Sequence, residues 1–437
     1  MAPSIPSVIA RPLARGADLI RGALGSLTWG PALAIAKPAV LSIFTKIEVG
    51  TLLLVDEPVG TRTVYGQRLT SKGPPPINGK NVPRKANTVP RVEIKLFIAN
   101  RDQLGNGTTI FSSISGAVSS IARTTNTLSD SLLNISAHYD ISNDMFAAFL
   151  SKDMTYSCPI WQTRESHNGP EETLEEAQMT KLRRFIDGAQ IKPTDYVLEI
   201  GTGWGSFAIE AVRKTGCRIT SLTLSKEQKR LAEERIDEAG FSARIDVHLM
   251  DYRSLPDTAV FDKVVSIEML ENVGQEYIGT YFACINRLLK RKGGIAMFQC
   301  ITMPEGRHEA YSKAEDFINK HIFPGGYLPS TMQLLNNISQ QSKGTLIVEQ
   351  VENIGGHYAK TLRLWRENFL SNFESKIRPA LKAEHPHMTT REMDVFRRKW
   401  EYYFAYCEAG FVTKTLGDVI ITVGREGASE LMEGIPL

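Results

Sequence analysis

The sequence lacks the features that mark several large classes of protein. It has five cysteines in 437 residues, widely spaced and with no Cys-x-x-Cys pair, so a disulfide scaffold is excluded and reduced thiols in an intracellular compartment are expected. It has almost no charge surplus, because 51 basic residues stand against 48 acidic ones. That balance argues against a nucleic-acid partner. No Gly-Lys-Ser/Thr phosphate loop occurs.

The overall composition is that of a globular protein with a sizeable core. Hydrophobic residues make up 42% of the chain and charged residues 23%, which excludes wholesale disorder and a collagen-like fibre. The length allows two or three domains, or one large domain with additions.

Residues 1–48 form a basic, weakly apolar leader. Its longest uncharged stretch, 22–36, is broken by three glycines and a proline, so it is too short and too interrupted to span a bilayer. Binding to the face of an anionic membrane, mitochondrial targeting and a leader without a role all remain open. The expected location is therefore intracellular, at the cytoplasmic face of a membrane, with mitochondria as an alternative.

Two further regions precede the main domain. Residues 49–100 read as a small α+β region, with short strands in 49–70 and 92–100 that flank a proline-rich loop. Residues 101–173 read as a helical cover and the start of the catalytic region, since Ile114, Val118 and Ile121 have helical spacing.

From residue 174 to 437 we expect one α/β domain. Strands are predicted at 196–200, 218–222, 245–249, 263–267 and 294–300, and helices at 175–188, from the glycine turn to 212, at 226–239 and at 277–289. Strands that alternate with helices favour a mostly parallel sheet covered on both faces. Ligands of such sheets bind beyond the carboxyl ends of the strands.

The sharpest local signal is the glycine-rich turn after the first of these strands. Gly201, Gly203 and Gly205 follow the apolar run Val197–Ile200, and glycines here allow a ligand to approach the backbone closely. Taken alone, the turn suits NAD, FAD, S-adenosylmethionine (SAM) or no ligand. Its spacing departs from the dinucleotide pattern and resembles the first motif of class I methyltransferases.

Several further segments extend this resemblance over residues 135–425. Together with the glycine turn they resemble the cyclopropane-fatty-acyl-phospholipid synthase and mycolic-acid cyclopropane synthase family, in a eukaryotic, fungal- or plant-like form. The segments are Ala137–Asp144, Met154–Trp161, Leu222–Gln228, Glu271–Gly274, Phe317–Gly326, His357–Trp365 and Trp400–Phe411.

The resemblance implies a fold and a reaction. The fold would be a Rossmann-like class I methyltransferase with a mostly parallel seven-stranded sheet flanked by helices. The reaction would transfer methylene from SAM to a cis double bond of an unsaturated phospholipid acyl chain at a membrane surface. A carbocation would form and lose a proton to bound bicarbonate, so the site must be dry and rich in aromatic faces. The resemblance involves no metal and allows a homodimer.

The resemblance also implies site residues. The bicarbonate would be held by Glu271, Tyr358, Gln299 and the backbones of Cys158 and Ile301. A nucleophilic role for Cys158 is disfavoured, because methyl leaves a sulfonium by direct displacement. The methyl donor would be bound by Tyr156, Ser157, Gly201, Thr202, Gly203, Thr223, Gln228, Asp251 and Tyr252.

Three departures from the family keep other functions open. Gln299 stands where bacterial members have histidine, Asn272 replaces the histidine after Glu271, and the N-terminal region is shortened. The alternatives are a lipid C-methyltransferase that closes no ring, for example on a sphingolipid, and a pseudoenzyme that binds SAM and lipid.

Overall fold

The computed structural model describes residues 52–56, 61–65, 141–162, 171–313, 316–433 and 435–436. The chain divides into two compact units, Met1–Thr109 and Ile110–Leu437. In the first unit, β1 (Leu52–Asp56) and β2 (Thr61–Tyr65) pair as an antiparallel hairpin, where short strands were expected. The predictions for the leader, the strand at 92–100 and the helix at 114–121 fall outside the described residues.

The second unit is built on a seven-stranded sheet with the order β5-β4-β3-β6-β7-β9-β8. Neighbouring strands from β5 to β7 are parallel, and β9 lies between β7 and β8 and runs antiparallel to both. The strands are β3 (Tyr196–Ile200), β4 (Arg218–Thr223), β5 (Ile245–Leu249), β6 (Lys263–Ile267), β7 (Ile295–Thr302), β8 (Ile347–Asn353) and β9 (Gly417–Gly424).

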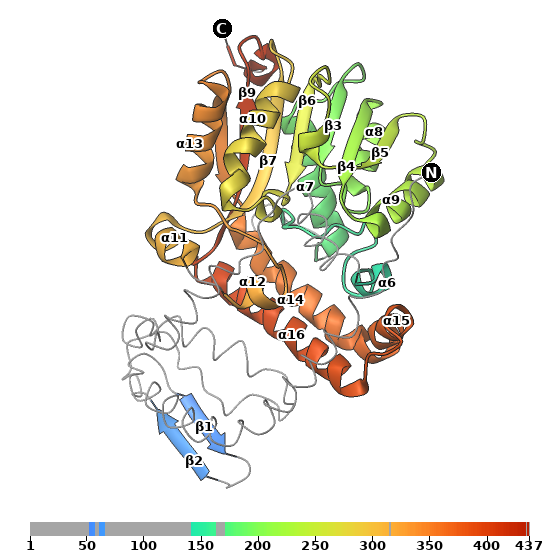
Figure 1. The fold of residues 1–437 in the computed structure, drawn as a ribbon, viewed down its shortest axis with the longest axis vertical. Coiled ribbons are helices and arrows are strands. Elements are labelled where there is room, and N and C mark those ends of the chain that lie inside the picture. The colour runs from blue at the N-terminus through green and yellow to red at the C-terminus, as the bar shows by residue number, and fades with distance from the viewer. Residues whose placement is uncertain are drawn as a thin grey trace, which may run out of the picture. The chain divides into compact units, whose positions relative to one another are not determined.

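Helices cover both faces of this sheet and its carboxyl edge (Figure 1). On one face lie α7 (Leu174–Gly188), α8 (Ser206–Thr215) and α9 (Lys226–Glu238), and on the other lie α10 (Ile278–Leu288) and α13 (Thr331–Ser342). Beyond the carboxyl ends of the parallel strands are α6 (Asn143–Ala147), α11 (Glu305–Ser312), α12 (Phe317–His321), α14 (Gly355–Asn372), α15 (Arg378–Glu384) and α16 (Thr390–Val412).

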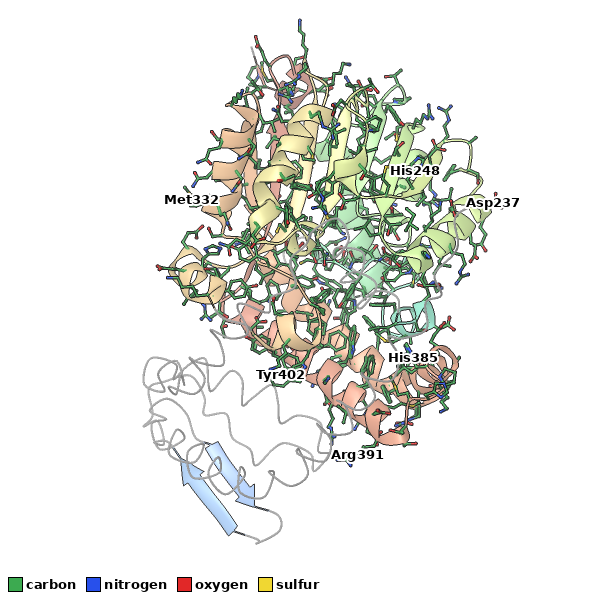
Figure 2. The ribbon with its side chains drawn as sticks, viewed as in Figure 1. Asp237, His248, Met332, His385, Arg391 and Tyr402 are labelled. Carbon is green, nitrogen blue, oxygen red and sulfur yellow. The ribbon has the colours of Figure 1, made fainter. Side chains whose placement is uncertain are left out.

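Burial on both faces explains the continuous apolar runs of the strands. Successive side chains of a strand point to opposite faces, so Val197 enters the core under α7 and α8 while Leu198 enters the core under α10 and α13. The remaining side chains fill the space between helices and sheet (Figure 2). The side chains on both faces of an inner strand must therefore be apolar.

Local caps fix where the long helices begin. Thr173 and Glu176 form a reciprocal capping box at the start of α7, and Thr389 and Glu392 do the same for α16. Such a box satisfies backbone donors that a helix cannot satisfy itself. No helix within the described ranges combines the length and the apolarity needed to cross a bilayer.

The alternating pattern predicted the first five strands closely. The bounds of β3, β5 and β6 match the expectation, and those of β4 and β7 differ by one or two residues. The mixed α/β fold with seven strands and flanking helices is confirmed. The pattern did not predict β8 and β9, because a strand inserted against the parallel direction leaves no signature in the sequence order.

Candidate active site

The three glycines after β3 share an unusual backbone conformation but have different surroundings. All have a positive φ, +103° at Gly201, +52° at Gly203 and +87° at Gly205, a region that other residues rarely adopt. A Cβ on Gly201 would lie 3.2 Å from Met269, and one on Gly205 would touch Ala232 of α9. A Cβ on Gly203 would meet nothing within 4 Å, so this glycine presents bare backbone to open space.

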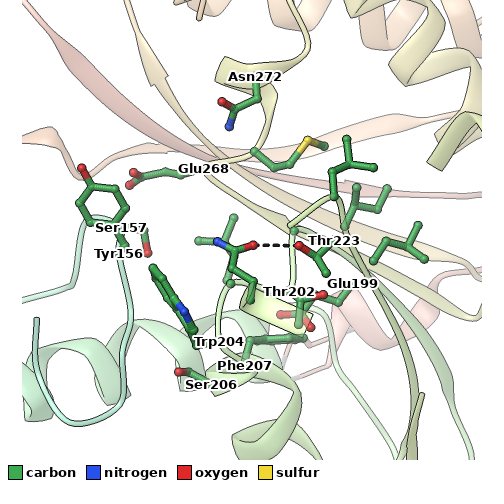
Figure 3. A pocket seen from close by; sticks show the side chains of 18 of the residues that line it. Tyr156, Ser157, Glu199, Thr202, Trp204, Ser206, Phe207, Thr223, Glu268 and Asn272 are labelled. Atoms are coloured by element: carbon green, nitrogen blue, oxygen red, sulfur yellow. Dashed lines mark hydrogen bonds between the residues drawn. The ribbon is translucent and has the colours of Figure 1, made fainter. Parts of the chain in front are cut away.

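That open space belongs to a pocket of about 1070 Å³ at the carboxyl ends of β3, β4, β5 and β6. Ten of the side chains around it are labelled in Figure 3. Nine residues were predicted to bind the methyl donor, and the structure brings all nine to this pocket: Tyr156, Ser157, Gly201, Thr202, Gly203, Thr223, Gln228, Asp251 and Tyr252.

Two of the predicted residues are held in place by each other. Thr223, the last residue of β4, donates its Oγ1 hydrogen to Gln228 Oε1 at 2.8 Å (Figure 3). Ser225 caps α9 between them, so the strand end and the helix start form one polar wall.

Asp251 has a more indirect place than expected. Its carboxylate accepts hydrogen bonds from the backbone and guanidinium of Arg253, at 2.7–2.9 Å. It lines the pocket, yet its oxygens already have partners within its own turn. Tyr252 is buried and packs edge-on against Tyr281.

Glu199 is a buried acid in the pocket that sequence reasoning missed. It is 3% exposed and accepts a hydrogen bond from Ser221 Oγ at 2.5 Å. Burial raises the pKa of Glu199 to about 8, against the opposing effects of Ser221 and Lys181. A cation in the pocket would favour its ionised form.

The residues predicted to hold bicarbonate also converge, but on Glu268. The Cys158 backbone N–H and the Gln299 side-chain amide donate to Glu268 Oε1, at 2.6 and 2.7 Å. The Tyr358 hydroxyl donates to Glu268 Oε2 at 2.6 Å. Glu268 reaches from the end of β6 towards the loop of Tyr156 and Ser157, and it lines the pocket (Figure 3).

The other predicted carboxylate, Glu271, holds a different donor. Its Oε1 accepts the backbone N–H of Ile301 at 2.5 Å, while its Oε2 is buried without a hydrogen-bond partner in the described part of the chain. Burial, followed by the charge of Glu268, raises the pKa of Glu271 to about 8. Glu271 is therefore mostly protonated at neutral pH.

A third acid and one cation complete the cluster. Asp418 of β9 is fully buried and accepts from Gln299 at 2.9 Å. Burial, followed by the charge of Glu268, raises the pKa of Asp418 well above its usual range, which favours the protonated form of this carboxyl. The buried Lys181 donates to Ser157 Oγ at 2.6 Å, and burial lowers its pKa.

The geometry corrects the prediction of bound bicarbonate. Three of the five groups assigned to that anion, on Cys158, Gln299 and Tyr358, already bind the Glu268 carboxylate. A second anion would lie beside a negative charge in a poorly solvated site and would find these donors occupied, and such like-charge contacts are strongly unfavourable. Bicarbonate does not fit this site.

Glu268 was missed although the sequence contained a hint of it. It stands three residues before Glu271, directly after a predicted strand, so two carboxylates were placed at one strand end. The parallel register sets Ile267 opposite Gln299, and Glu268 N donates to the Gln299 carbonyl at 2.9 Å. This spacing could not show which of the two glutamates accepts the hydrogen bonds, because the donors on Cys158, Gln299 and Tyr358 come from distant segments of the chain.

The backbone at Glu268 is strained. Its φ is +46°, a left-handed conformation that costs a non-glycine residue about 1–2 kcal/mol. Strain of this kind persists where surrounding interactions impose it, and it concentrates at functional sites. Three hydrogen bonds hold the carboxylate of this residue.

The thiol of Cys158 is inert. It is fully buried, and burial raises its pKa well above the usual range, so it carries no thiolate. Its backbone takes part in the site instead: the N–H donates to Glu268 and the carbonyl accepts from Gln299. Both observations agree with the prediction that Cys158 is no nucleophile.

Aromatic side chains surround the cluster. Tyr156 lies 5.1 Å from Trp365 between ring centroids, and its hydroxyl is 2.9 Å from that of Tyr403. Tyr358 packs against Trp365 at 5.8 Å. Of the aromatic residues in the segments that carry the resemblance, Tyr139 falls outside the described residues, and Trp161 is buried with its indole N–H bound to Thr361.

A second pocket, of about 740 Å³, lies near α15 and α16. Its lining is mostly apolar, with Trp400 shared between this pocket and the aromatic core. His385, labelled in Figure 2, contributes to it. The full lining is Ile141, His321, Ile322, Leu381, His385, Met388, Phe396, Lys399 and Trp400.

Comparison with known proteins identifies the family. Residues 126–420 match the family described as mycolic acid cyclopropane synthetase. The chain is 44% identical over 295 residues to tuberculostearic acid methyltransferase UfaA1 of Mycobacterium tuberculosis, covering 67% of this chain and 65% of that protein. It is 34% identical to cyclopropane-fatty-acyl-phospholipid synthase of Escherichia coli, covering 66% of this chain and 67% of the relative.

Solved structures agree with this match. Mycolic acid cyclopropane synthase CmaA1, complexed with SAH and CTAB, superposes with a TM-score of 0.58 at 27% identity, covering 67% of this chain and 98% of that one. Coclaurine N-methyltransferase, at 17% identity and a TM-score of 0.59, shares the fold and covers 76% of this chain and 94% of its own.

The chain thus has the fold of a class I SAM-dependent methyltransferase. Within that class, the chain belongs to the mycolic acid cyclopropane synthetase family. The match covers just under two thirds of the length of the tuberculostearic acid methyltransferase.

Proposed function

We propose that this protein transfers a one-carbon unit from SAM to a cis double bond in an unsaturated phospholipid acyl chain and closes a cyclopropane ring. The observation that carries the proposal is the position of Glu268. It lines the predicted donor pocket and is also the centre of a cluster of buried acids and aromatics. The name of the Escherichia coli relative supports this activity.

The residues of the pocket fit the methyl donor. When bound, SAM supplies an electrophilic methyl group on a positively charged sulfur. Gly203 offers bare backbone for close approach, Thr223 and Gln228 offer a polar wall for hydroxyl groups, and Glu199 offers negative charge that ionises more readily beside a cation. The SAH in the solved relative supports the same assignment.

The surroundings of the pocket fit an alkene as acceptor. An alkene is a weak nucleophile, so the chain must hold it close and in line with the donor. The cation formed on transfer must be kept from water and is stabilised by aromatic faces. Tyr156 lines the pocket and packs against Trp365 and Phe146, which supports such an environment.

The second pocket supports a lipid substrate. Ile322, Leu381 and Phe396 give it an apolar lining suited to a hydrocarbon tail. His321, His385 and Lys399 add basic groups that suit an anionic head group. Trp400 connects it to Phe146 and Phe149, which in turn pack on Tyr156.

Access from a membrane surface is part of the proposal. The basic, acid-poor leader of residues 1–48 supports attraction to an anionic bilayer at its cytoplasmic face. The full-length protein should sediment with anionic phospholipid vesicles, and less so at high salt. Equal sedimentation with zwitterionic vesicles would contradict an electrostatic contribution.

Methyl transfer without ring closure is the second candidate. It would use the same site, in which Glu268 accepts from the donor groups on Cys158, Gln299 and Tyr358. The relative at 44% identity is named a methyltransferase of tuberculostearic acid. Both candidates begin with the same carbon transfer and differ in how the resulting cation is quenched.

One experiment tests both candidates. The purified full-length protein is incubated with SAM carrying a ¹³C-labelled methyl group and with vesicles of unsaturated phospholipid, and the extracted lipids are examined by mass spectrometry and NMR. The expected result is a gain of one labelled CH₂ unit per acyl chain, with NMR signals that distinguish a ring from a methyl branch. Donor binding without any lipid product would contradict both and indicate a pseudoenzyme.

A further inference from the structure

We infer that the Glu268 carboxylate is this enzyme's own proton acceptor, standing where the family resemblance implies a bicarbonate ion. The inference rests on the proposed function and deepens it. The protein would carry its catalytic anion as a side chain and would need none from solution.

The hydrogen bonds around the carboxylate favour its charged form. Glu268 Oε1 accepts two N–H groups, from Cys158 and Gln299, and Oε2 accepts the Tyr358 hydroxyl. Only an ionised carboxylate accepts at both oxygens without donating. The three donors therefore stabilise the charged form, which is the form that a base requires.

The other two acids of the cluster favour their protonated forms. Asp418 and Glu271 both have pKa values raised by burial and by the charge of Glu268. Each also has a buried oxygen without a hydrogen-bond partner in the described residues, Asp418 Oδ1 and Glu271 Oε2. Both are therefore neutral neighbours, and the negative charge belongs to Glu268.

Access to the donor pocket also distinguishes Glu268 from the other two acids. Of the three acids, Glu268 alone lines the donor pocket, and it is half-buried, whereas Asp418 has no exposed surface. Its side chain reaches into that space from a backbone with a strained φ of +46° (Figure 3). A glycine would adopt this backbone without strain, so the carboxylate and not the backbone accounts for a glutamate here.

The proton transfer is balanced without any further reactant. The π electrons of the alkene form a bond to the methyl carbon, and the carbon–sulfur bond breaks with its electron pair left on sulfur. A C–H bond of the transferred methyl then breaks, its electrons close the ring, and the proton passes to the Glu268 carboxylate. Burial raises the pKa of Glu268, which favours acceptance, and the proton leaves to solvent after the products.

Two substitutions separate the charge of Glu268 from the space that it fills. Glu268→Gln keeps the volume and removes the base, while Glu268→Gly empties the cradle and relieves the backbone. Lys343→Gly is the matched control, because Lys343 also has a left-handed backbone, with φ +55°, at the end of α13 and outside the pocket.

The rate assay is run in carbon dioxide-depleted buffer, with and without added bicarbonate or formate. We expect wild type and Lys343→Gly to turn over equally in both buffers. We expect Glu268→Gln to be slower by roughly 10²–10⁴-fold, the usual worth of a general base, and to gain nothing from added anion. Glu268→Gly should be equally slow alone and faster with either anion.

A binding readout accompanies the rates. Calorimetry measures the SAM affinity of every variant, because Glu268 lines the pocket and a loss of donor binding must be separated from a loss of the proton-transfer step. The ¹³C NMR line of bicarbonate should broaden with Glu268→Gly and stay sharp with wild type. Bicarbonate that broadens with wild type or accelerates it, or a Glu268→Gln rate near wild type, would overturn the inference.

Failure of the proposed function is a separate result. If wild type transfers no carbon to any lipid, the proposed function fails, whereas the NMR arm still decides whether Glu268 occupies the anion cradle. If the bicarbonate line also stays sharp with Glu268→Gly, the groups on Cys158, Gln299 and Tyr358 form no anion site. That result would refute the inference that Glu268 occupies such a site.

Discussion

The two halves of the site differ in how their residues come together. Most of the predicted donor-binding residues lie between Gly201 and Tyr252, at the ends of three successive parallel strands. The residues of the acid cluster come from five separate segments. These are the loop of Cys158, the end of β6 with Glu268, β7 with Gln299, α14 with Tyr358 and β9 with Asp418. The comparison teaches that a short motif suffices for the donor half, whereas only the folded chain defines the proton-accepting half.

The largest effect is expected from a substitution that disrupts only the donor-binding half of the site. Gly203→Val should reduce SAM affinity by at least about 100-fold, because its side chain would fill the open space beside the turn and its φ of +52° disfavours a branched residue. Isothermal calorimetry measures the loss.

Gly240→Val is the matched control for Gly203→Val. Gly240 also has a positive φ, +76°, and open space around it, but it lies in an exposed turn outside the pocket. It should bind SAM as wild type does. Equal losses in the two variants would show that backbone strain, and not the pocket, explains the effect.

The pH dependence of donor binding tests the electrostatics of the same half. The free protein holds a proton on Glu199 up to about pH 8, and a bound cation favours the ionised form. Affinity should therefore rise with pH up to about 8 and then level off, by at most about tenfold per unit. Glu199→Gln should flatten the profile, and a profile that stays steep in this variant would assign the effect elsewhere.

A smaller effect is expected at Glu271, one of the two neutral acids of the cluster. Glu271→Gln should slow turnover by less than about tenfold, because a neutral acid supplies no general-base contribution and an amide oxygen can still accept the Ile301 N–H. Lipid product formation measures it beside Glu268→Gln. A larger loss at Glu271 than at Glu268 would reverse the roles of the two acids.

The smallest effect is expected at the buried thiol. Cys158→Ala should leave turnover within about threefold of wild type and cost stability by about 1 kcal/mol, as for other small losses of buried side-chain volume. The reason is that the backbone N–H, and not Sγ, reaches Glu268. Loss of activity with retained folding, seen by circular dichroism, would restore a chemical role for the thiol.

The parts of the fold that the sequence predicted are likewise those built from consecutive segments of the chain. The strand–helix alternation predicted β3 to β7 because burial on both faces forces apolar runs of fixed length. It did not predict β9, which enters between β7 and β8 from the end of the chain. Asp418, carried by that strand, was for the same reason absent from the expected site.

The site was predicted to a similar extent. All nine donor residues line one pocket, and Cys158, Gln299 and Tyr358 do form an anion cradle, as the resemblance implied. The resemblance implied bicarbonate in this cradle, whereas in the structure the Glu268 carboxylate accepts from the three donors. Glu268 lies three residues from a motif glutamate, and nothing in that spacing says which of two acids meets donors from distant segments.

The sequence by itself determined the donor half, because a turn between consecutive elements is governed by local conformation, above all by the glycines that alone accept its φ values. The tertiary structure decided the state of the acids. Whether a carboxyl is charged depends on the solvent it loses and the donors it gains, and for Glu268 those donors lie 31, 90 and 110 residues away along the chain.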